Sequence, residues 1–367
     1  MTCSNKIAMS AFLIALACGA AAAAPIGAAQ RAALNACVVR AAGEMKFNGA
    51  VYLAQPGDPV VAKNFGASDA GGKIRITDNT RFNIASAGKM FTAIAIGLLV
   101  ERGKIAFDAP IGRYLPGLDP QTATITISQL LLHTSGLGDY FTPANMRAVQ
   151  SAKTAADLLP LALAAPLAFA PGSKIAYSNS GFVVLGAIVE KISGMSYAEF
   201  VRKEIFIPLG MTNTRPTAEG AAEPMTRMSM NGGMLDQPQP SPIPPGFASP
   251  AGGMFSTVSD MSRFLTALAN HQLIKAGTLA ALFRPRAHPP ARVGHNGGTP
   301  GANAEIWFYP DSGWQLIALS NYDPPVATRM AVVLEQAMLA TDTAAACTAA
   351  LAAPPPQMPL AMPAPRQ

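Results

Sequence analysis

The sequence predicts an α+β protein, in which strands from the two ends of the chain share one sheet and helices fill the middle. Two strand segments, joined by a Pro-Gly-Asp-Pro turn, occupy residues 48–67. Three more, in residues 291–298, 302–310 and 314–321, lie near the other end. Between these groups, apolar residues recur at helical spacing. Because strands that are distant in sequence can pair in one sheet, we expect a sheet domain with a mostly helical insertion.

The helices follow in chain order from apolar spacing and from residues that start or stop a helix. Gly43, Gly103 and Gly194 each follow an apolar segment and are expected to end its helix. Ser196 and Glu199 have the spacing of a capping box, which starts the next one. We therefore expect helices within residues 28–43, 83–104, 124–137, 154–164, 179–194, 256–270 and 325–340.

Shifts in composition divide the chain into a leader, two structural parts and a tail. We expect residues 30–85 and 250–345 to form the sheet part, and residues 86–249 to form the mainly helical part, with the functional site between them. The helical part ends in a stretch rich in Pro, Gly and Met, residues 221–250, which is typical of a long irregular connection. Residues 346–367 are rich in Pro and Ala, so we expect a disordered tail.

The N-terminal segment, residues 1–24, is typical of a secretory signal peptide. Lys6 precedes a short apolar stretch that is followed by small residues, and cleavage is expected there or as late as residue 29. The alternative is a lipid anchor on Cys18, but the leucine usual three residues before such a cysteine is absent. We therefore expect a periplasmic or secreted protein whose mature chain has no transmembrane segment.

Charge and motif content argue against several classes of function. The formal net charge is +6, but Lys and Arg residues are scattered without interleaved aromatic residues, so we expect no nucleic-acid partner. The four histidines are scattered along the sequence, and neither an H-E-x-x-H motif nor paired cysteines occur, so we expect no metal and no other cofactor. The G-x-S-x-G elbow of an α/β-hydrolase is also absent.

Two cysteines, Cys37 and Cys347, are expected to remain after the leader is removed, one near each end of the mature chain. In an oxidising compartment they can form a disulfide, which would stabilise the fold by about 5 kcal/mol in the chain-entropy model because the loop it closes is very long. The alternative is two unrelated, half-buried thiols, since spacing alone does not show that the two ends meet.

Ser86 and Lys89 are the first candidates for catalysis. They lie three residues apart, directly before an uncharged run from Met90 to Val100. Residues at this spacing share one face of a helix, so the two side chains are expected to be neighbours. Burial against apolar side chains lowers the pKa of a lysine, and a hydroxyl beside such an amine is an activated nucleophile. The alternative is a serine that caps the helix and a lysine that extends to solvent.

Two further segments carry residues that accompany this pair. The segment AYSNSG supplies Tyr177 and Asn179 before a predicted helix, and VGHNGGTPG supplies His295, Asn296 and Gly297 on a predicted strand. In this order, with LLHTSGL and AGGMFSTVSD between them, the segments resemble the serine β-lactamase and penicillin-binding-protein family. The Tyr-x-Asn motif is most similar to the branch that holds class C β-lactamases, D-alanyl-D-alanine carboxypeptidases and related esterases.

The resemblance, which covers about residues 50–321, implies an antiparallel sheet flanked by helices and an acyl-enzyme mechanism. Ser86 would be the acylated nucleophile, and Lys89 and Tyr177 its general bases. A phenol serves as a base only where cations hold its pKa down, and Lys89 is the expected cation. The backbone N–H groups of Ser86 and Gly298 would form the oxyanion hole.

The resemblance also implies substrate contacts by Asn179, His295, Asn296 and Gly297. Many β-lactamases have Lys-Thr-Gly where this chain has His-Asn-Gly, and a lysine there is a permanent cation for a substrate carboxylate. Three upstream arginines are candidates for replacing that cation: Arg284, Arg286 and Arg292. We therefore expect a small-molecule or peptide substrate with an amide or ester bond: a D-amino-acid peptide, an ester or a β-lactam. The missing lysine favours the peptide or the ester over efficient β-lactam hydrolysis, although a β-lactam can still acylate Ser86.

The alternative to an enzyme is a catalytically silent protein of the same fold that senses cell-wall peptides or penicillins. The presence of Ser86, Lys89 and Tyr177 together argues against it, since a binding protein does not need all three. His133, in LLHTSGL, is expected to have a structural role near a helix end.

Overall fold

The computed structural model describes residues 25–228, 234–241, 248–283 and 291–354. The strands are β1 Gly49–Gln55, β2 Asp58–Phe65, β3 Phe82–Asn83, β4 Met225–Met228, β5 Met234–Pro240, β6 Phe255–Ser256, β7 Val293–Thr299, β8 Ala302–Phe308 and β9 Gln315–Ser320. The helices are α1 Ala28–Met45, α2 Lys89–Glu101, α3 Pro120–Ala123, α4 Ile127–Leu131, α5 Met146–Ser151, α6 Ala155–Ala162, α7 Asn179–Ser193, α8 Tyr197–Val201, α9 Val258–Ala269, α10 Ala276–Leu282, α11 Val326–Leu339 and α12 Thr343–Ala352. Short 3₁₀ turns, among them η1 Ala85–Gly88, and one π-helical turn, Arg202–Phe206, complete the elements. The predicted leader, with Cys18, lies outside the described residues.

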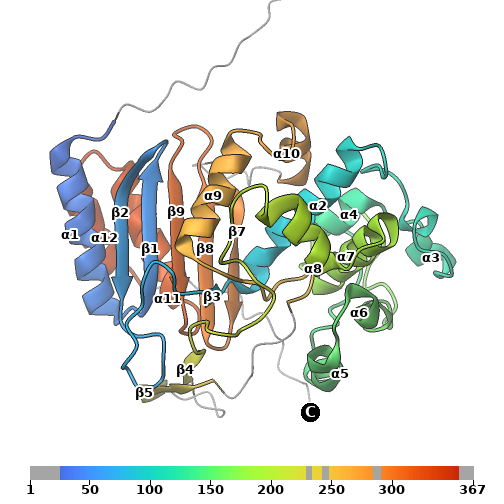
Figure 1. The fold of residues 1–367 in the computed structure, drawn as a ribbon, viewed down its shortest axis with the longest axis horizontal. Helices are drawn as coiled ribbons and strands as arrows, with labels where there is room; N and C mark the ends of the chain where they lie inside the picture. The colour runs from blue at the N-terminus through green and yellow to red at the C-terminus, as the bar shows by residue number, and fades with distance from the viewer. Residues whose placement is uncertain (1–24, 229–233, 242–247, 284–290, 355–367) are drawn as a thin grey trace, which may run out of the picture.

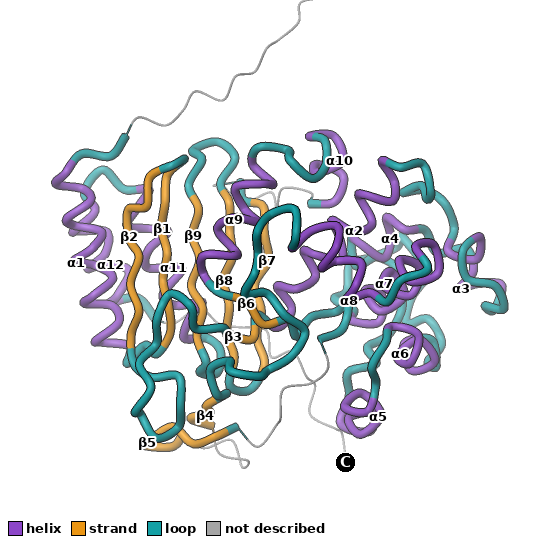
Figure 2. Tube along the Cα trace, in the orientation of Figure 1, coloured by secondary structure: helices purple, strands orange, loops and turns teal. Residues whose placement is uncertain are grey.

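The main sheet has five strands in the order β2-β1-β9-β8-β7, as Figure 1 and Figure 2 show. Every neighbouring pair is antiparallel. The strand β1, near the start of the chain, pairs directly with β9, near its end. The expectation of an α+β fold with an antiparallel sheet built from both ends is therefore confirmed. The strand β7 is one edge of this sheet.

Both faces of the sheet are covered by helices, which explains why β8 and β9 are buried along their whole length. The helices α1, α11 and α12 pack together on one side of the sheet, to the left of the strands and behind them in Figure 1, while α9 covers the other face. Successive residues of β9 alternate between the two sides: Leu316 packs in the cluster with α1 and α11, and Ile317 packs in the cluster with α2 and α9.

A disulfide joins Cys37 on α1 to Cys347 on α12, with the two Cα atoms 5.9 Å apart. Of the two alternatives that the sequence left open, the structure has the pair. The prediction of a disordered tail from residue 346 was wrong for its first part, because residues 343–352 form α12. Asp342 caps this helix, its Ala-rich sequence favours helix, and Leu351 is buried. Residues 355–367 lie outside the described part.

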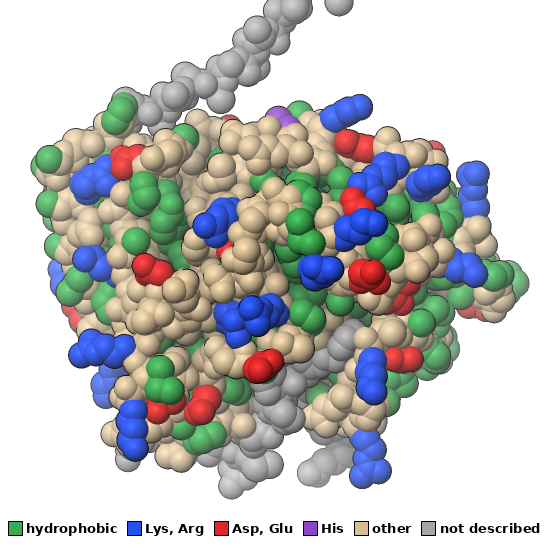
Figure 3. Space-filling model, in the orientation of Figure 1, with side chains coloured by type: hydrophobic (Ala, Val, Ile, Leu, Met, Phe, Trp, Pro, Cys, Tyr) green, Lys and Arg blue, Asp and Glu red, His purple; other side chains and the backbone are tan. Residues whose placement is uncertain are grey.

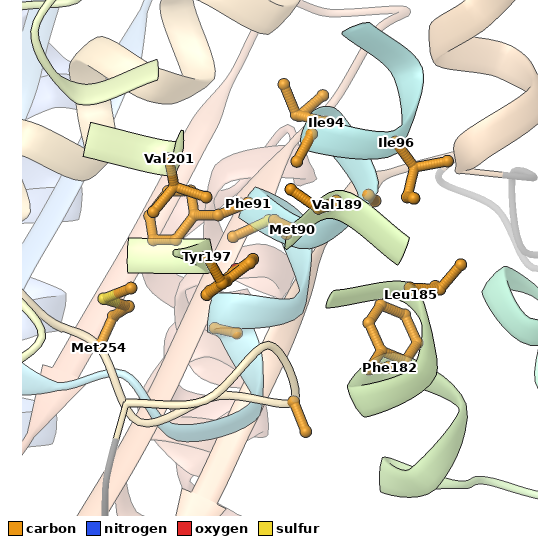
Figure 4. Packing of buried hydrophobic residues seen from close by; sticks show 14 of the residues in the cluster. Met90, Phe91, Ile94, Ile96, Phe182, Leu185, Val189, Tyr197, Val201 and Met254 are labelled. Carbon is orange, nitrogen blue, oxygen red and sulfur yellow. The ribbon is translucent and has the colours of Figure 1, made fainter. Parts of the chain in front are cut away.

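The helical part is organised around α2, which is buried along almost its whole length. Figure 4 shows Met90, Phe91 and Ile94 of α2 among side chains from α7 and α8. The Phe91 ring also makes edge-to-face contacts with Phe206, at 4.9 Å between centroids, and with Phe264 of α9, at 5.0 Å. This packing attaches α2 rigidly to both parts of the fold, so the residues at its N-terminal end have a fixed position.

Three predicted elements differ in detail from the structure. The helix expected from residue 83 begins at Lys89, and the 3₁₀ turn η1 precedes it. The helix expected in residues 124–137 is limited to α4, because His133 adopts a left-handed conformation with φ 58°. The stretch predicted as irregular, residues 221–250, contains the antiparallel pair β4–β5.

No single helix in the described part of the chain is long and apolar enough to cross a membrane. One pair of helical segments, Asn179–Ser193 and Tyr197–Phe206, meets the length and composition criteria together, but it is bent by 77°. On the face shown in Figure 3, Lys and Arg side chains are spread over the sheet and the helices rather than gathered over one element.

Candidate active site

Ser86 lies in η1, at the junction between β3 and the buried helix α2. The preceding residue, Ala85, has φ 44°, a left-handed conformation that a non-glycine residue adopts only when its surroundings hold it there. Its N–H donates to Asn83 Oδ1 at 2.8 Å, and its carbonyl accepts from the Gly253 N–H at 3.1 Å. A tight turn held at both ends therefore presents the Ser86 side chain.

Lys89 is the first residue of α2 and is only 1% exposed. Its Nζ donates to Asn179 Oδ1 at 2.7 Å and to the backbone oxygen of Ala251, and it lies 3.2 Å from Ser86 Oγ. The spacing of three residues thus brings the serine and lysine together, as predicted. The lysine does not extend to solvent.

Burial lowers the pKa of Lys89 from 10.5 to about 7, and the nearby carboxylate of Asp139 opposes this change. The cause is desolvation, since the amine is enclosed by protein and loses the hydration that stabilises its charged form. The ring of Tyr177, 4.9 Å from Nζ, and the ring of Phe182, 5.4 Å away, form part of this enclosure. A large fraction of Lys89 is therefore neutral near pH 7.

Tyr177 and Asn179 lie at the start of α7, where Ser178 caps the helix by accepting a hydrogen bond from the Gly181 N–H. The Tyr177 hydroxyl donates to Ser86 Oγ at 2.7 Å. The imidazole of His133 stacks on the Tyr177 ring with centroids 4.7 Å apart, and its Nδ1 accepts from the Ser178 N–H at 3.2 Å. His133 therefore orients the tyrosine.

The pKa of Tyr177 is raised, whereas the role of a general base predicted from the sequence requires a lowered pKa. Although 47% of the residue is exposed, desolvation of its hydroxyl raises the pKa, and the carboxylate of Asp139 raises it further. The hydrogen bond with Ser86 lowers it, but by less. Lys89 does not lower the pKa of Tyr177, because burial brings the pKa of that amine to about 7 and leaves only about half of it charged at pH 7. Tyr177 is therefore a neutral phenol that donates its proton toward Ser86.

Asp139 is a site residue that the sequence analysis missed. Its Oδ2 accepts from Asn179 Nδ2 at 2.8 Å, while Asn179 Oδ1 faces Lys89, so one hydrogen-bonded chain connects the carboxylate to the amine. The Asn179 amide is thereby held with its oxygen toward Lys89. Asp139 lies six residues after His133 in an irregular segment, where no periodicity marks it as part of a site.

The edge strand β7 runs alongside η1. At Gly297, an added Cβ would lie 2.1 Å from the Ile84 oxygen and 3.0 Å from the Ala87 nitrogen, so only glycine allows this approach. At Gly298, an added Cβ would instead meet Pro324. Side chains alternate along a strand, so His295 lies on the same face as Gly297, toward η1, and Asn296 lies on the other face.

His295 is half-buried, and its Nδ1 is hydrogen-bonded to the backbone oxygen of Asn296. Of the three arginines considered as replacement cations, Arg284 and Arg286 lie outside the described residues. Arg292 forms an ion pair with Glu335 at 3.2 Å and stacks on the Trp307 ring at 4.2 Å. Those contacts hold Arg292 against β8 and α11, so it is already paired there.

The site contains no evident metal ligands: no group of three or more His, Cys, Asp or Glu residues in the described part of the chain could hold a metal ion. The arrangement places a hydroxyl between a buried amine of lowered pKa and a phenol, next to a strand edge with glycines. That combination is suited to nucleophilic attack on a carbonyl group.

Comparisons with known proteins show which family the chain resembles. The family model described as Beta-lactamase matches residues 35–337, a range that includes η1, the start of α7 and β7. Penicillin-binding protein 4* from Bacillus subtilis is 30% identical over 323 residues, which is 78% of this chain and 71% of that protein. Esterase EstB from Burkholderia gladioli is 30% identical over 290 residues, covering 69% of this chain and 74% of the esterase. Among solved structures, D-amino acid amidase from Ochrobactrum anthropi complexed with D-phenylalanine has a TM-score of 0.71 and 25% identity, covering 80% of this chain and 92% of that one.

Proposed function

The chain belongs to the Beta-lactamase family and is a serine hydrolase, and from this premise we propose that it acts through an acyl-enzyme on Ser86. Lys89 takes the serine proton, and Tyr177 passes protons between Lys89, the leaving group and water. Asn179 holds Lys89 and contacts the substrate. The backbone N–H groups of Ser86 and Gly298 bind the carbonyl oxygen.

The observation that carries this proposal is the set of contacts around Lys89 Nζ. Two backbone or side-chain oxygens, those of Ala251 and Asn179, accept hydrogen bonds from it, and Ser86 Oγ lies 3.2 Å away. A neutral amine has two N–H bonds and one lone pair. With both N–H groups occupied by the two oxygens, the lone pair is directed to the Ser86 hydroxyl, which is the geometry that a general base requires.

In the proposed acylation, each bond that breaks is matched by one that forms. The Ser86 oxygen bonds to the substrate carbonyl carbon, and the hydroxyl proton moves to Lys89 Nζ. When the bond from that carbon to the amine or alcohol breaks, the leaving group takes a proton from Tyr177, which is replaced by the one on Lys89. Water reverses these steps and releases the acid. Because Tyr177 is a neutral phenol with a raised pKa, we assign it this relay role rather than that of a phenolate base.

We propose that the substrates are amides or esters of the D-amino-acid type. The support is twofold: the chain is similar to proteins described as an esterase, a D-amino acid amidase and a penicillin-binding protein, and His295 stands where many β-lactamases have a lysine. Because a histidine is mostly neutral at pH 7, it provides little attraction for a substrate carboxylate.

Intact-protein mass spectrometry tests the mechanism. Wild type and Ser86→Ala are incubated separately with a penicillin, a D-alanyl-D-alanine peptide and a p-nitrophenyl ester. We expect turnover or a covalent adduct with at least one compound in wild type and neither in Ser86→Ala. A persistent penicillin adduct without peptide or ester turnover would favour a sensor. Turnover by Ser86→Ala would contradict the mechanism.

We propose that the protein is exported from the cytoplasm. The disulfide between Cys37 and Cys347 supports this location, because disulfides persist in oxidising compartments. Cell fractionation of the full chain, with and without residues 1–24, tests it. Recovery of both forms from the cytoplasm would contradict the proposal.

A further inference from the structure

Asn303 is a buried polar residue in the sheet, behind the candidate oxyanion hole. It lies on β8, directly opposite Gly298 in the antiparallel register, and is only 1% exposed. A buried amide is costly unless its oxygen and its NH₂ group both find partners. The partners that it has here connect the edge strand β7 to the N-terminus of α11.

The Asn303 side chain has one possible orientation. Its Oδ1 accepts from the backbone N–H of Ala327 at 2.8 Å and from that of Thr328 at 3.1 Å. Backbone N–H groups only donate, so the amide oxygen must face α11. The Nδ2 must then face the other way, where it donates to the Gly297 carbonyl at 2.9 Å.

A second layer holds the α11 end of this chain of contacts. Thr328 Oγ1 donates to Glu305 Oε1 at 2.7 Å, and the same carboxyl accepts from Trp307 Nε1 at 2.6 Å through its other oxygen. Glu305 is 4% exposed and lies on β8 two residues after Asn303. The orientation of Asn303 is therefore determined by buried, hydrogen-bonded groups rather than by solvent.

The hydrogen bond to Gly297 has a consequence for the next N–H group along the strand. In a planar trans peptide, the C=O and the following N–H point in opposite directions. With the Gly297 carbonyl held toward Asn303, the Gly298 N–H points to the outer edge of the sheet. The turn η1 lies next to this edge, because Gly297, the neighbouring residue, packs against Ile84 and Ala87 through one face of β7.

We propose that Asn303 is a positioning residue, which aims the Gly298 N–H at the carbonyl oxygen of the substrate on Ser86. This inference rests on the proposed function, in which Gly298 is an oxyanion donor. Asn303 itself does not contact the substrate. Hydrogen bonds that connect Glu305, Thr328, Asn303 and Gly297 in series fix the Gly298 N–H relative to α11.

The test is Asn303→Asp, which preserves shape and the acceptor facing α11 but replaces the donor facing Gly297 with an oxygen. We expect kcat for a p-nitrophenyl ester to fall by about 10²-fold, with KM changed by less than about threefold, since oxyanion contacts act in the transition state. The decisive readout is the ratio of kcat/KM for the ester and for the matching thionoester. Oxyanion donors bind developing O⁻ better than S⁻, so this ratio should fall by about tenfold.

The matched control is Asn35→Asp. Asn35, on α1, donates its amide to the Val60 carbonyl of β2 at 2.9 Å, so the same chemical change is made at a sheet edge far from Ser86. Its kinetics should equal those of wild type. If Asn303→Asp does not fold, the same ratio is measured for Thr328→Val. This variant keeps the backbone N–H of residue 328 and removes only the hydroxyl, which contacts Glu305 and lies 3.4 Å from Asn303 Oδ1.

An unchanged ester-to-thionoester ratio in the folded variant would overturn the inference, even if the melting temperature or the total activity changed. Ser86→Ala, assayed in parallel, separates this result from the proposed function. Turnover by Ser86→Ala would overturn the acyl-enzyme mechanism and this inference with it. Loss of turnover there, together with an unchanged ratio for Asn303→Asp, would overturn only the role of Asn303.

Discussion

Replacing Lys89 by arginine should remove both the activity and the pH dependence that Lys89 causes. Burial lowers the pKa of Lys89 from 10.5 to about 7, a change worth about 5 kcal/mol against the charged form at about 1.4 kcal/mol per pH unit. At pH 7 about half of the amine is neutral, which is about 10³ times the neutral fraction of an unshifted lysine. An arginine stays protonated and offers no lone pair to Ser86.

The assay is kcat/KM for a p-nitrophenyl ester between pH 5 and pH 9, with Ser86→Ala as the blank. For wild type, the value should rise about tenfold per pH unit below pH 7 and level off above it, because the neutral amine is the active form. For Lys89→Arg, it should be lower by about 10³-fold, with no inflection near pH 7. Lys104→Arg, on the exposed surface, should match wild type.

Two histidines near the site require controls, because imidazole also titrates between pH 5 and pH 9 and could cause the inflection assigned to Lys89. His295 lies on β7 toward η1, and His133 stacks on Tyr177. His295→Gln and His133→Gln should each retain the inflection near pH 7. An inflection that persists in Lys89→Arg, or that disappears in either glutamine variant, would refute the assignment of the base to Lys89.

Three further outcomes are expected. Asp139→Asn should shift the acidic limb of kcat/KM to lower pH, because the carboxylate raises the pKa of Lys89 and its removal lets that pKa fall; a shift to higher pH would contradict this electrostatic role. Gly297→Ala should lower kcat by about 10²-fold, because its Cβ would lie 2.1 Å from a backbone oxygen and displace the oxyanion donor. Gly277→Ala, where nothing lies within 4 Å, should remain fully active in the same assay. Cys347→Ser should lower the free energy of unfolding by about 2–5 kcal/mol in urea titrations with unchanged kcat; equal stability would show that the disulfide does not restrain the unfolded chain.

The arrangement of Ser86 and Lys89 was predictable from the sequence because it is local. Three residues of separation place two side chains on one face, and an uncharged run after Lys89 implies that the amine is buried. The strands of the main sheet were also predictable, since apolar residues bounded by turn residues mark them. Their pairing was inferred in outline, and the structure adds the order β2-β1-β9-β8-β7.

The prediction failed where composition was used without packing. The Ala-rich segment after residue 342 has the low complexity of a tail, but the same alanines favour a helix once Asp342 caps it and Cys347 attaches it to α1. The His133 region failed for the opposite reason. Its apolar spacing is helical, yet a left-handed backbone at His133 ends the helix so that the imidazole can stack on Tyr177.

The sequence by itself therefore determined the fold class and the neighbouring positions of Ser86 and the buried Lys89, because these depend on short-range spacing and on which residues are apolar. Only the tertiary structure decided the electrostatics and the supporting contacts. The direction of the Tyr177 pKa depends on whether desolvation exceeds the effect of nearby charges. Asp139 and Asn303 act through hydrogen bonds to residues that are distant in sequence, and folding alone brings those partners together.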